Sequence, residues 1–152
     1  MDIKQRRFSL DHDTNNTIEF RRCCTHNYLT ATLQGREPFI AEEFHASAGN
    51  REILAIFKAG KKHTALDRAL DIYLPKDIES GTYPLNSADR LIEIAFTENF
   101  PAYATHWTIT GTMNLSVNSE ALQYSGHIQL VFKGREGGEF TADSEFGFSL
   151  ST

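Results

Sequence analysis

Hydrophobic and polar residues alternate with a period of two through the last third of the chain. Three runs show the pattern most clearly, at 105–117, 122–133 and 139–150. Strict alternation is typical of a β-strand with one face buried and one face in solvent. Because only short turn-like segments separate the runs, the pattern predicts a three-strand antiparallel meander.

The alternation also predicts which residues of the first two runs face each other. If residues 118–121 form the connecting loop, Met113 lies opposite Gly126 and Gly111 lies opposite Ile128. In these two pairs a large side chain on the buried face meets a glycine on the neighbouring strand. A shift of one residue would turn every apolar group to solvent, so the parity of the register is strongly set, whereas a shift of two would preserve it.

The same reasoning applies to the second and third runs. If residues 134–138 form their loop, Lys133 lies opposite Glu139 and Gly126 lies opposite Phe146. Gly126 is therefore expected to sit between large neighbours, where an added side chain would collide with them. The outer face then carries one polar row across the three strands: Thr112, His127 and Glu145.

Shorter alternating runs fill the chain before the meander. Strands are expected at 17–23, 28–34, 39–46, 52–59, 69–74, 81–85 and 91–97. Residues 35–38 (GREP) predict a turn, so that 28–46 is expected to be a hairpin. At 64–74 a helical spacing of apolar residues competes with alternation. A turn at 64–68 followed by a strand is favoured, because the alternation runs directly into Pro75.

These elements predict a fold built from strands alone. The chain has 152 residues, one domain by length, and its 11 Phe and 5 Tyr favour strands. Numerous short strands at close spacing predict an all-β antiparallel sandwich of about eight to ten strands, with a lipocalin-like barrel as the alternative. Residues 1–16 are expected to form a polar N-terminal arm, and 17–152 a single domain.

Charge and the N-terminal residues narrow the classes of function. The net charge of −5 argues against nucleic-acid binding, and no apolar run is long enough to span a membrane. No apolar segment follows the first basic residues, so a cytoplasmic location is expected if Met1 is the native start, and a secreted or periplasmic one if a leader has been removed. Adjacent cysteines rarely bridge each other, so Cys23 and Cys24 are expected to be free thiols.

Four segments together resemble a known group of domains. They are YLTATLQGREPF at 28–39, SGTYPL at 80–85, ITGTMNL at 109–115 and YSGHIQLVF at 124–132. Their order resembles uncharacterised bacterial all-β domains, many of which occur on secreted lipoproteins. The resemblance covers roughly 28–150, rests on turn and packing motifs, and implies a β-sandwich but no activity. Unlike that group, residues 1–16 show neither a signal-like apolar segment nor a cysteine, so a lipoprotein location is not expected.

The sequence predicts neither a metal site nor a cofactor. Residues 11–19 place oxygen-bearing side chains on alternate positions, as calcium loops do, but the glycine and the final glutamate of such a loop are absent. No two histidines lie at the spacing that binds a metal from one strand or helix. The glycine-rich residues 134–138 join two strands rather than opening a helix, which argues against a phosphate site.

Two sets of side chains are candidates for a functional site. His127 is expected to lie near Glu145 and Asp143, and an imidazole beside a carboxylate can act as a general base, although such pairs are commonly surface contacts. The second set is aromatic and could line a ligand pocket: Tyr83, Phe100, Tyr103 and Trp107.

The favoured function is a non-enzymatic, small acidic binding module, such as an immunity-like or adaptor protein that presents an acidic surface to a basic protein partner. The alternative is a carrier of a small apolar ligand, which requires a cavity lined by Phe and Tyr. The third hypothesis is a hydrolase-like enzyme that uses His127 or His106 with a carboxylate. The sequence does not indicate the partner or the oligomeric state.

Overall fold

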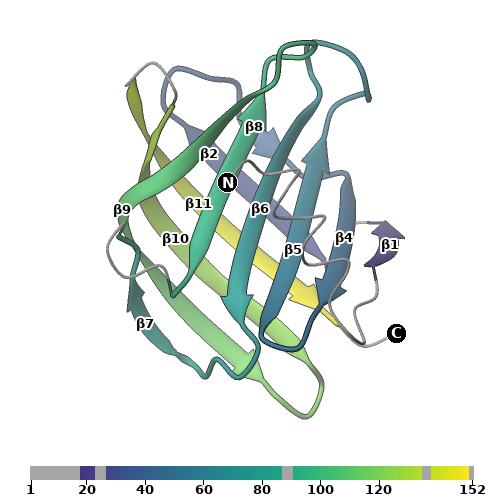
Figure 1. The fold of residues 1–152 in the computed structure, drawn as a ribbon, viewed down its shortest axis with the longest axis vertical. Helices are drawn as coiled ribbons and strands as arrows, with labels where there is room; N and C mark the ends of the chain where they lie inside the picture. Colours follow the sequence, from purple (N-terminus) through teal and green to yellow (C-terminus); the bar gives the residue numbers. More distant parts are fainter. Residues whose placement is uncertain (1–17, 23–26, 87–90, 135–137, 151–152) are drawn as a thin grey trace.

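The computed structural model describes residues 18–22, 27–86, 91–134 and 138–150, all of whose regular structure is β-strand (Figure 1). The predicted N-terminal arm and the two cysteines lie outside these residues. The strands are β1 (Ile18–Arg22), β2 (Tyr28–Leu33), β3 (Phe39–Ile40), β4 (Glu43–Ala48), β5 (Glu52–Ala59), β6 (Arg68–Pro75), β7 (Gly81–Pro84), β8 (Glu93–Glu98), β9 (Ala104–Asn118), β10 (Gln123–Lys133) and β11 (Glu139–Ser149).

The strands form one antiparallel sheet in the order β1-β4-β5-β6-β8-β9-β10-β11-β2-β3, with β7 paired to the edge of β9. The sheet curls into a half-barrel, so that strands from its two ends face each other (Figure 1). The ring centroids of Phe44 and Phe148 lie 5.6 Å apart, and those of Phe39 and Phe96 lie 6.2 Å apart. The predicted all-β antiparallel fold is confirmed, with a continuous curled sheet in place of two separate layers.

The interior of the half-barrel is filled by aromatic and aliphatic side chains. Among the described residues, eight of the largest fully buried side chains are aromatic, and the phenylalanine rings contact one another across the sheet. They are Tyr73, Phe39, Phe44, Phe57, Phe96, Phe132, Phe146 and Phe148. All except Tyr73 belong to the main core. Burial of so much apolar area is the main contribution to the stability of the fold.

The expected strand at 39–46 is wrong, because the chain changes partner in its middle. Residues Phe39 and Ile40 pair with β2, but from Glu43 onward the chain pairs with β5 and β1. At the changeover, the backbone N–H of Ala41 donates to Leu29 in β2, and that of Glu42 donates to Lys58 in β5. These two residues therefore link opposite ends of the sheet.

The central strands β5 and β6 are buried on both faces, as the nearly continuous apolar sequence of 52–59 predicts. A second apolar cluster lies on the outer face, formed by Leu54, Ile56 and Tyr73 with Trp107 packed against them. The structure also confirms a strand, and not a helix, in the second half of 64–74.

The meander forms as predicted, with one difference in register. The pairing of β10 with β11 is confirmed, since Gly126 lies opposite Phe146 and Lys133 opposite Glu139. Between β9 and β10 the predicted register is wrong by two residues, so that Gly126 lies opposite Leu115 and Ile128 opposite Met113. The parity, and hence the choice of buried face, is confirmed.

The shift arises because the loop occupies residues 119–122 and not 118–121. Asn118 remains in β9, and its side-chain oxygen accepts a hydrogen bond from the N–H of Ala121 at 3.2 Å. Asparagine favours such local turns. Leu122 completes the loop with a φ of 52°.

A β-bulge in β9 exchanges the two faces of that strand. Val131 pairs with Thr110 and Phe132 pairs with Thr108, which leaves Ile109 as the extra residue. On the C-terminal side of the bulge, Met113 faces the interior. On its N-terminal side His106 faces the interior, as its ring contacts show.

Candidate functional site

The predicted aromatic set does not form one pocket. The rings of Phe100 and Tyr103 lie 5.7 Å apart, with His63 against Phe100 at 5.6 Å. Trp107 lies on the outer face, stacked on Tyr73 at 6.3 Å. The bulge in β9 explains this position, because it turns position 107 away from the interior.

Tyr83 lies further along the sheet, on the short edge strand β7 opposite Met113. Its hydroxyl donates a 2.6 Å hydrogen bond to the carbonyl of Glu79, and its ring packs at the edge of the main core. Tyr103 has a different polar partner, since its hydroxyl donates to Asp67 at 2.6 Å. Each of the two hydroxyl groups therefore has a hydrogen-bond partner within the protein.

The predicted polar row exists, with one residue replaced. His127 lies opposite Glu145 as expected, but on β9 its partner is Asn114, whereas Thr112 lies two residues away beside Gln129. The correction follows from the register shift between β9 and β10.

The outer face of β9, β10, β11 and β2 is predominantly polar over three successive rows on the C-terminal side of the bulge in β9. Successive cross-strand rows are Ser116–Ser125–Gly147–Tyr28, then Asn114–His127–Glu145–Thr30, then Thr112–Gln129–Asp143–Thr32. We call this surface the outer polar face. The residues in these rows other than Gly147 are exposed or half-buried, and Lys and Arg do not occur among them.

A hydrogen-bond network crosses the middle of the outer polar face. His127 Nε2 lies 2.8 Å from Asp143 Oδ1, and the side-chain amide of Gln129 donates to Asp143 Oδ2 at 3.1 Å. The hydrogen bonds from His127 and Gln129 hold the pKa of the Asp143 carboxyl below its ordinary value. The His127 and Asp143 side chains are 38% and 50% exposed, so this pair lies on an open surface rather than in a cleft.

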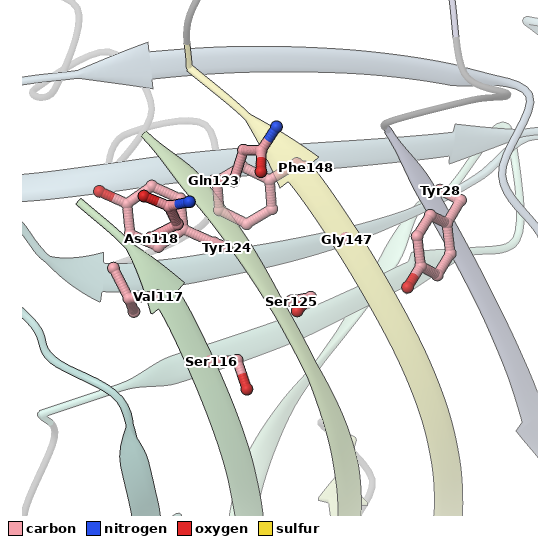
Figure 2. Close-up of a pocket in the computed structure, with 9 residues that line it drawn as sticks. All are labelled: Tyr28, Ser116, Val117, Asn118, Gln123, Tyr124, Ser125, Gly147 and Phe148. Carbon is pink, nitrogen blue, oxygen red and sulfur yellow. The ribbon is translucent and has the colours of Figure 1, made fainter. Parts of the chain in front are cut away.

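One hollow of about 300 Å³ lies at the end of this face nearest the 119–122 loop (Figure 2). Its polar lining comes from neutral side chains on adjacent strands: Ser116, Asn118, Gln123 and Ser125. The hollow also contacts Val117, Tyr124, Gly147 and Phe148, and Tyr28 borders it from β2. Burial, with a smaller effect from Asp77, raises the pKa of Tyr124, so this lining side chain stays neutral at pH 7.

The side chain of Tyr28 lies over Gly147 on the adjacent strand. A Cβ at position 147 would approach Tyr28 Cε1 to 2.5 Å, so any other residue would push the ring away. Glycine weakens a strand interior, and there it often marks a close approach. Tyr28 nevertheless remains 42% exposed, which leaves part of the ring available to a ligand.

A second hollow of about 550 Å³ lies further along the same four strands. Its polar residues are Thr32, Gln34, Thr110, Gln129, Thr141 and Asp143. Gly111 forms part of its floor, at a φ of 153° and so close to Leu130 that a Cβ would lie 2.6 Å from Leu130 Cβ. The His127 row separates the two hollows.

A second histidine–carboxylate pair lies inside the protein. Glu98 Oε2 lies 2.8 Å from His106 Nε2, and Arg36 binds the same carboxylate through Nη2 at 2.7 Å and Nε at 2.9 Å. Burial alone would raise the pKa of Glu98, but the hydrogen bonds and charge of Arg36, followed by those of His106, outweigh it and lower the pKa. Sequence reasoning named His106 as a candidate but missed both partners, which are distant in sequence.

Aromatic rings enclose this cluster. The His106 ring stacks on Phe96 and meets Phe140 edge-on at 5.0 Å, while the Arg36 guanidinium lies 3.6 Å from the Phe140 ring centre. His106 Nδ1 is buried without a hydrogen-bond partner. A base must reach the proton that it abstracts, and the burial of this nitrogen argues against catalysis.

Within the part of the chain that the structure describes, no group of three or more His, Cys, Asp and Glu side chains is placed to hold a metal ion. The same residues contain no helix long and apolar enough to cross a membrane.

Comparisons with protein-family models, with curated proteins and with solved structures found no match.

Proposed function

We propose that this protein is a non-enzymatic binding module whose ligand lies along the outer polar face. The observation that supports the proposal most directly is that two hollows open on the same four strands and are joined by a row of hydrogen-bonding side chains. An extended ligand could contact both hollows across the His127 row.

The packing of the interior favours a surface site over a carrier function. A carrier needs an enclosed cavity lined by apolar side chains. Here the aromatic side chains at the centre of the half-barrel are fully buried and contact one another: Phe44, Phe57 and Phe148, for example, lie within 6.2 Å of each other by ring centroid.

The geometry also argues against a hydrolase. The exposed pair, His127 and Asp143, lies on an open sheet surface, and the buried pair, His106 and Glu98, is enclosed by rings. Both histidine–carboxylate contacts have ordinary structural explanations: one is a cross-strand surface pair, and the other shares its carboxylate with Arg36.

The test compares two double variants on arrays of oligosaccharides and peptides. Thr32→Arg/Thr112→Arg places two long cationic side chains on the outer polar face, at the exposed ends of the Thr112–Gln129–Asp143–Thr32 row that borders the second hollow. Leu66→Arg/Leu91→Arg is the matched control, because it adds the same charge at exposed positions outside these four strands.

We expect ligands of the wild-type protein to be retained by the control and lost by the face variant. Loss from both variants, or retention by both, would contradict the proposed face. Chemical conversion of a bound ligand would contradict a non-enzymatic role.

A further inference from the structure

We infer that the hollow beside Tyr28 binds a sugar ring of an uncharged oligosaccharide; this inference rests on the proposed function and specifies its ligand.

The hollow results from three small residues in one cross-strand row. Ser116, Ser125 and Gly147 lie side by side on β9, β10 and β11, and Tyr28 follows on β2. Because same-face residues on neighbouring strands are within contact distance, a row of small residues leaves a depression that larger residues would fill. Tyr28 forms a wall of this depression, as Figure 2 shows.

The lining is chemically matched to neutral hydroxyl groups. Serine hydroxyls both donate and accept hydrogen bonds, and the amides of Asn118 and Gln123 also provide both functions. Sugar hydroxyls have the same dual character. Among the described residues that line the hollow, no side chain is acidic or basic, which favours an uncharged ligand over a phosphate, a carboxylate or a basic peptide.

The exposed ring of Tyr28 can supply the apolar contact that hydroxyl groups alone do not. Aromatic side chains combine a large apolar surface with little conformational freedom, and tyrosine adds a polar end. One face of a pyranose ring presents C–H groups that can stack on such a surface. Gly147 leaves free the space over the strand that the Tyr28 ring occupies.

Because a second hollow lies on the same face, an oligosaccharide matches this surface better than a single sugar does. Ser125 lines the first hollow and Gln129 the second, and four residues of extended strand span roughly 14 Å. Asn114, His127 and Glu145 lie between them and offer further hydrogen-bonding groups. An oligosaccharide that binds in the first hollow could therefore continue along the outer polar face.

The experiment measures the affinity of the protein for four uncharged hexasaccharides: β-1,4-linked glucose, β-1,3-linked glucose, α-1,4-linked glucose and β-1,4-linked xylose. Oligogalacturonate and a proline-rich peptide serve as charged and peptide comparisons. Isothermal titration calorimetry is run on wild type, Tyr28→Ala, Tyr28→Phe and the control Ile40→Ala, whose side chain is 63% exposed on the neighbouring strand. Thermal melting of each variant verifies that it is folded.

We expect at least one uncharged hexasaccharide to bind in preference to both comparison ligands. Tyr28→Ala should weaken binding roughly five- to tenfold through loss of stacking, while Tyr28→Phe and Ile40→Ala should bind within about twofold of wild type. Absence of binding to all four hexasaccharides at millimolar concentration would overturn the inference, as would preference for oligogalacturonate or the peptide.

The two proposals fail in distinguishable ways. Binding that Thr32→Arg/Thr112→Arg abolishes but Tyr28→Ala leaves unchanged would overturn the sugar site at Tyr28 while supporting the outer polar face. Binding that neither change affects would overturn both.

Discussion

Glu98 and His106 face each other inside the half-barrel, with Glu98 Oε2 2.8 Å from His106 Nε2. The Glu98 side chain is 11% exposed and also binds Arg36, which comes from the turn after β2. A buried charge is costly unless it is paired, so the three side chains depend on one another.

Replacing Glu98 with Gln should therefore destabilise the fold. The change leaves the Arg36 guanidinium, 27% exposed, without its anionic partner, and we expect a loss of about 1–3 kcal/mol in the free energy of unfolding. Urea denaturation at pH 7 measures this difference. Glu37→Gln is the control, because Glu37 is exposed, and it should unfold like wild type.

The contribution of Glu98 should also depend on pH. Its pKa is lower in the folded protein than the ordinary 4.5, so the folded state binds fewer protons near that pH. The stabilisation is complete above the ordinary pKa and is lost as the pH falls through the lower, folded-state pKa. The difference between wild type and Glu98→Gln should shrink under acid conditions; a difference that stays constant down to pH 2 would contradict this account.

Gly126 should be intolerant of any side chain. An added Cβ would lie 2.3 Å from the backbone oxygen of Asn114 and 3.1 Å from the Phe146 ring, so backbone as well as side chains would have to move. We expect Gly126→Ala to cost about 1–3 kcal/mol, and Gly126→Val more. The control is Gly138→Ala, where nothing lies within 4 Å of the added atom. Equal unfolding midpoints for the two alanine variants would show that the packing around Gly126 is not as described.

Asp143 should titrate below its ordinary pKa of 3.8 because His127 and Gln129 donate to it. Removing the first donor with His127→Ala should raise the Asp143 pKa toward the ordinary value. Carbon-detected NMR of the carboxyl group over a pH series measures this shift directly. If the Asp143 pKa is the same in both proteins, the His127–Asp143 contact does not form in solution.

The fold should not depend on a metal ion. The described residues bring together no set of side chains suited to hold one. Thermal melting curves recorded with and without a strong chelator should coincide. A fall of many degrees on chelation would show that a metal site exists in the protein.

Sequence alone predicted most of the strands, and the buried faces of the meander on the C-terminal side of the bulge, because alternation is a local property. Glu52–Ala59 has the predicted bounds, and the register around Phe146 is as expected. The predicted register around Met113 was wrong because two loops give the same parity. Asn118 can be the first residue of a loop at 118–121, or the last residue of the strand before a loop at 119–122. In the structure Asn118 pairs with Gln123 and its side chain accepts a hydrogen bond from the N–H of Ala121.

Two other features were not predictable because they depend on distant parts of the chain. The change of strand partner at Ala41 requires β2 and β5 to lie close enough for consecutive residues to hydrogen-bond to each of them. The bulge at Ile109 is defined only by the pairing of β9 with β10, yet it determines that Trp107 faces outward.

The hollow beside Tyr28 was missed for the same reason. Ser116, Ser125 and Gly147 are separated in sequence and form one row only in the observed register. The available signal was Gly147, which occupies a solvent-facing position in a long alternating run. Such a position can ordinarily hold a larger residue, so a glycine there indicates that another side chain packs over it.

The most direct test of the binding module is residue-resolved NMR of the uniformly labelled protein during titration with the tightest-binding hexasaccharide. We expect the shifted amides to cluster on the outer polar face, with the largest changes at Tyr28, Ser125 and Gly147. Shifts confined to the surroundings of Glu98 and His106, or spread through the phenylalanine core, would contradict this expectation.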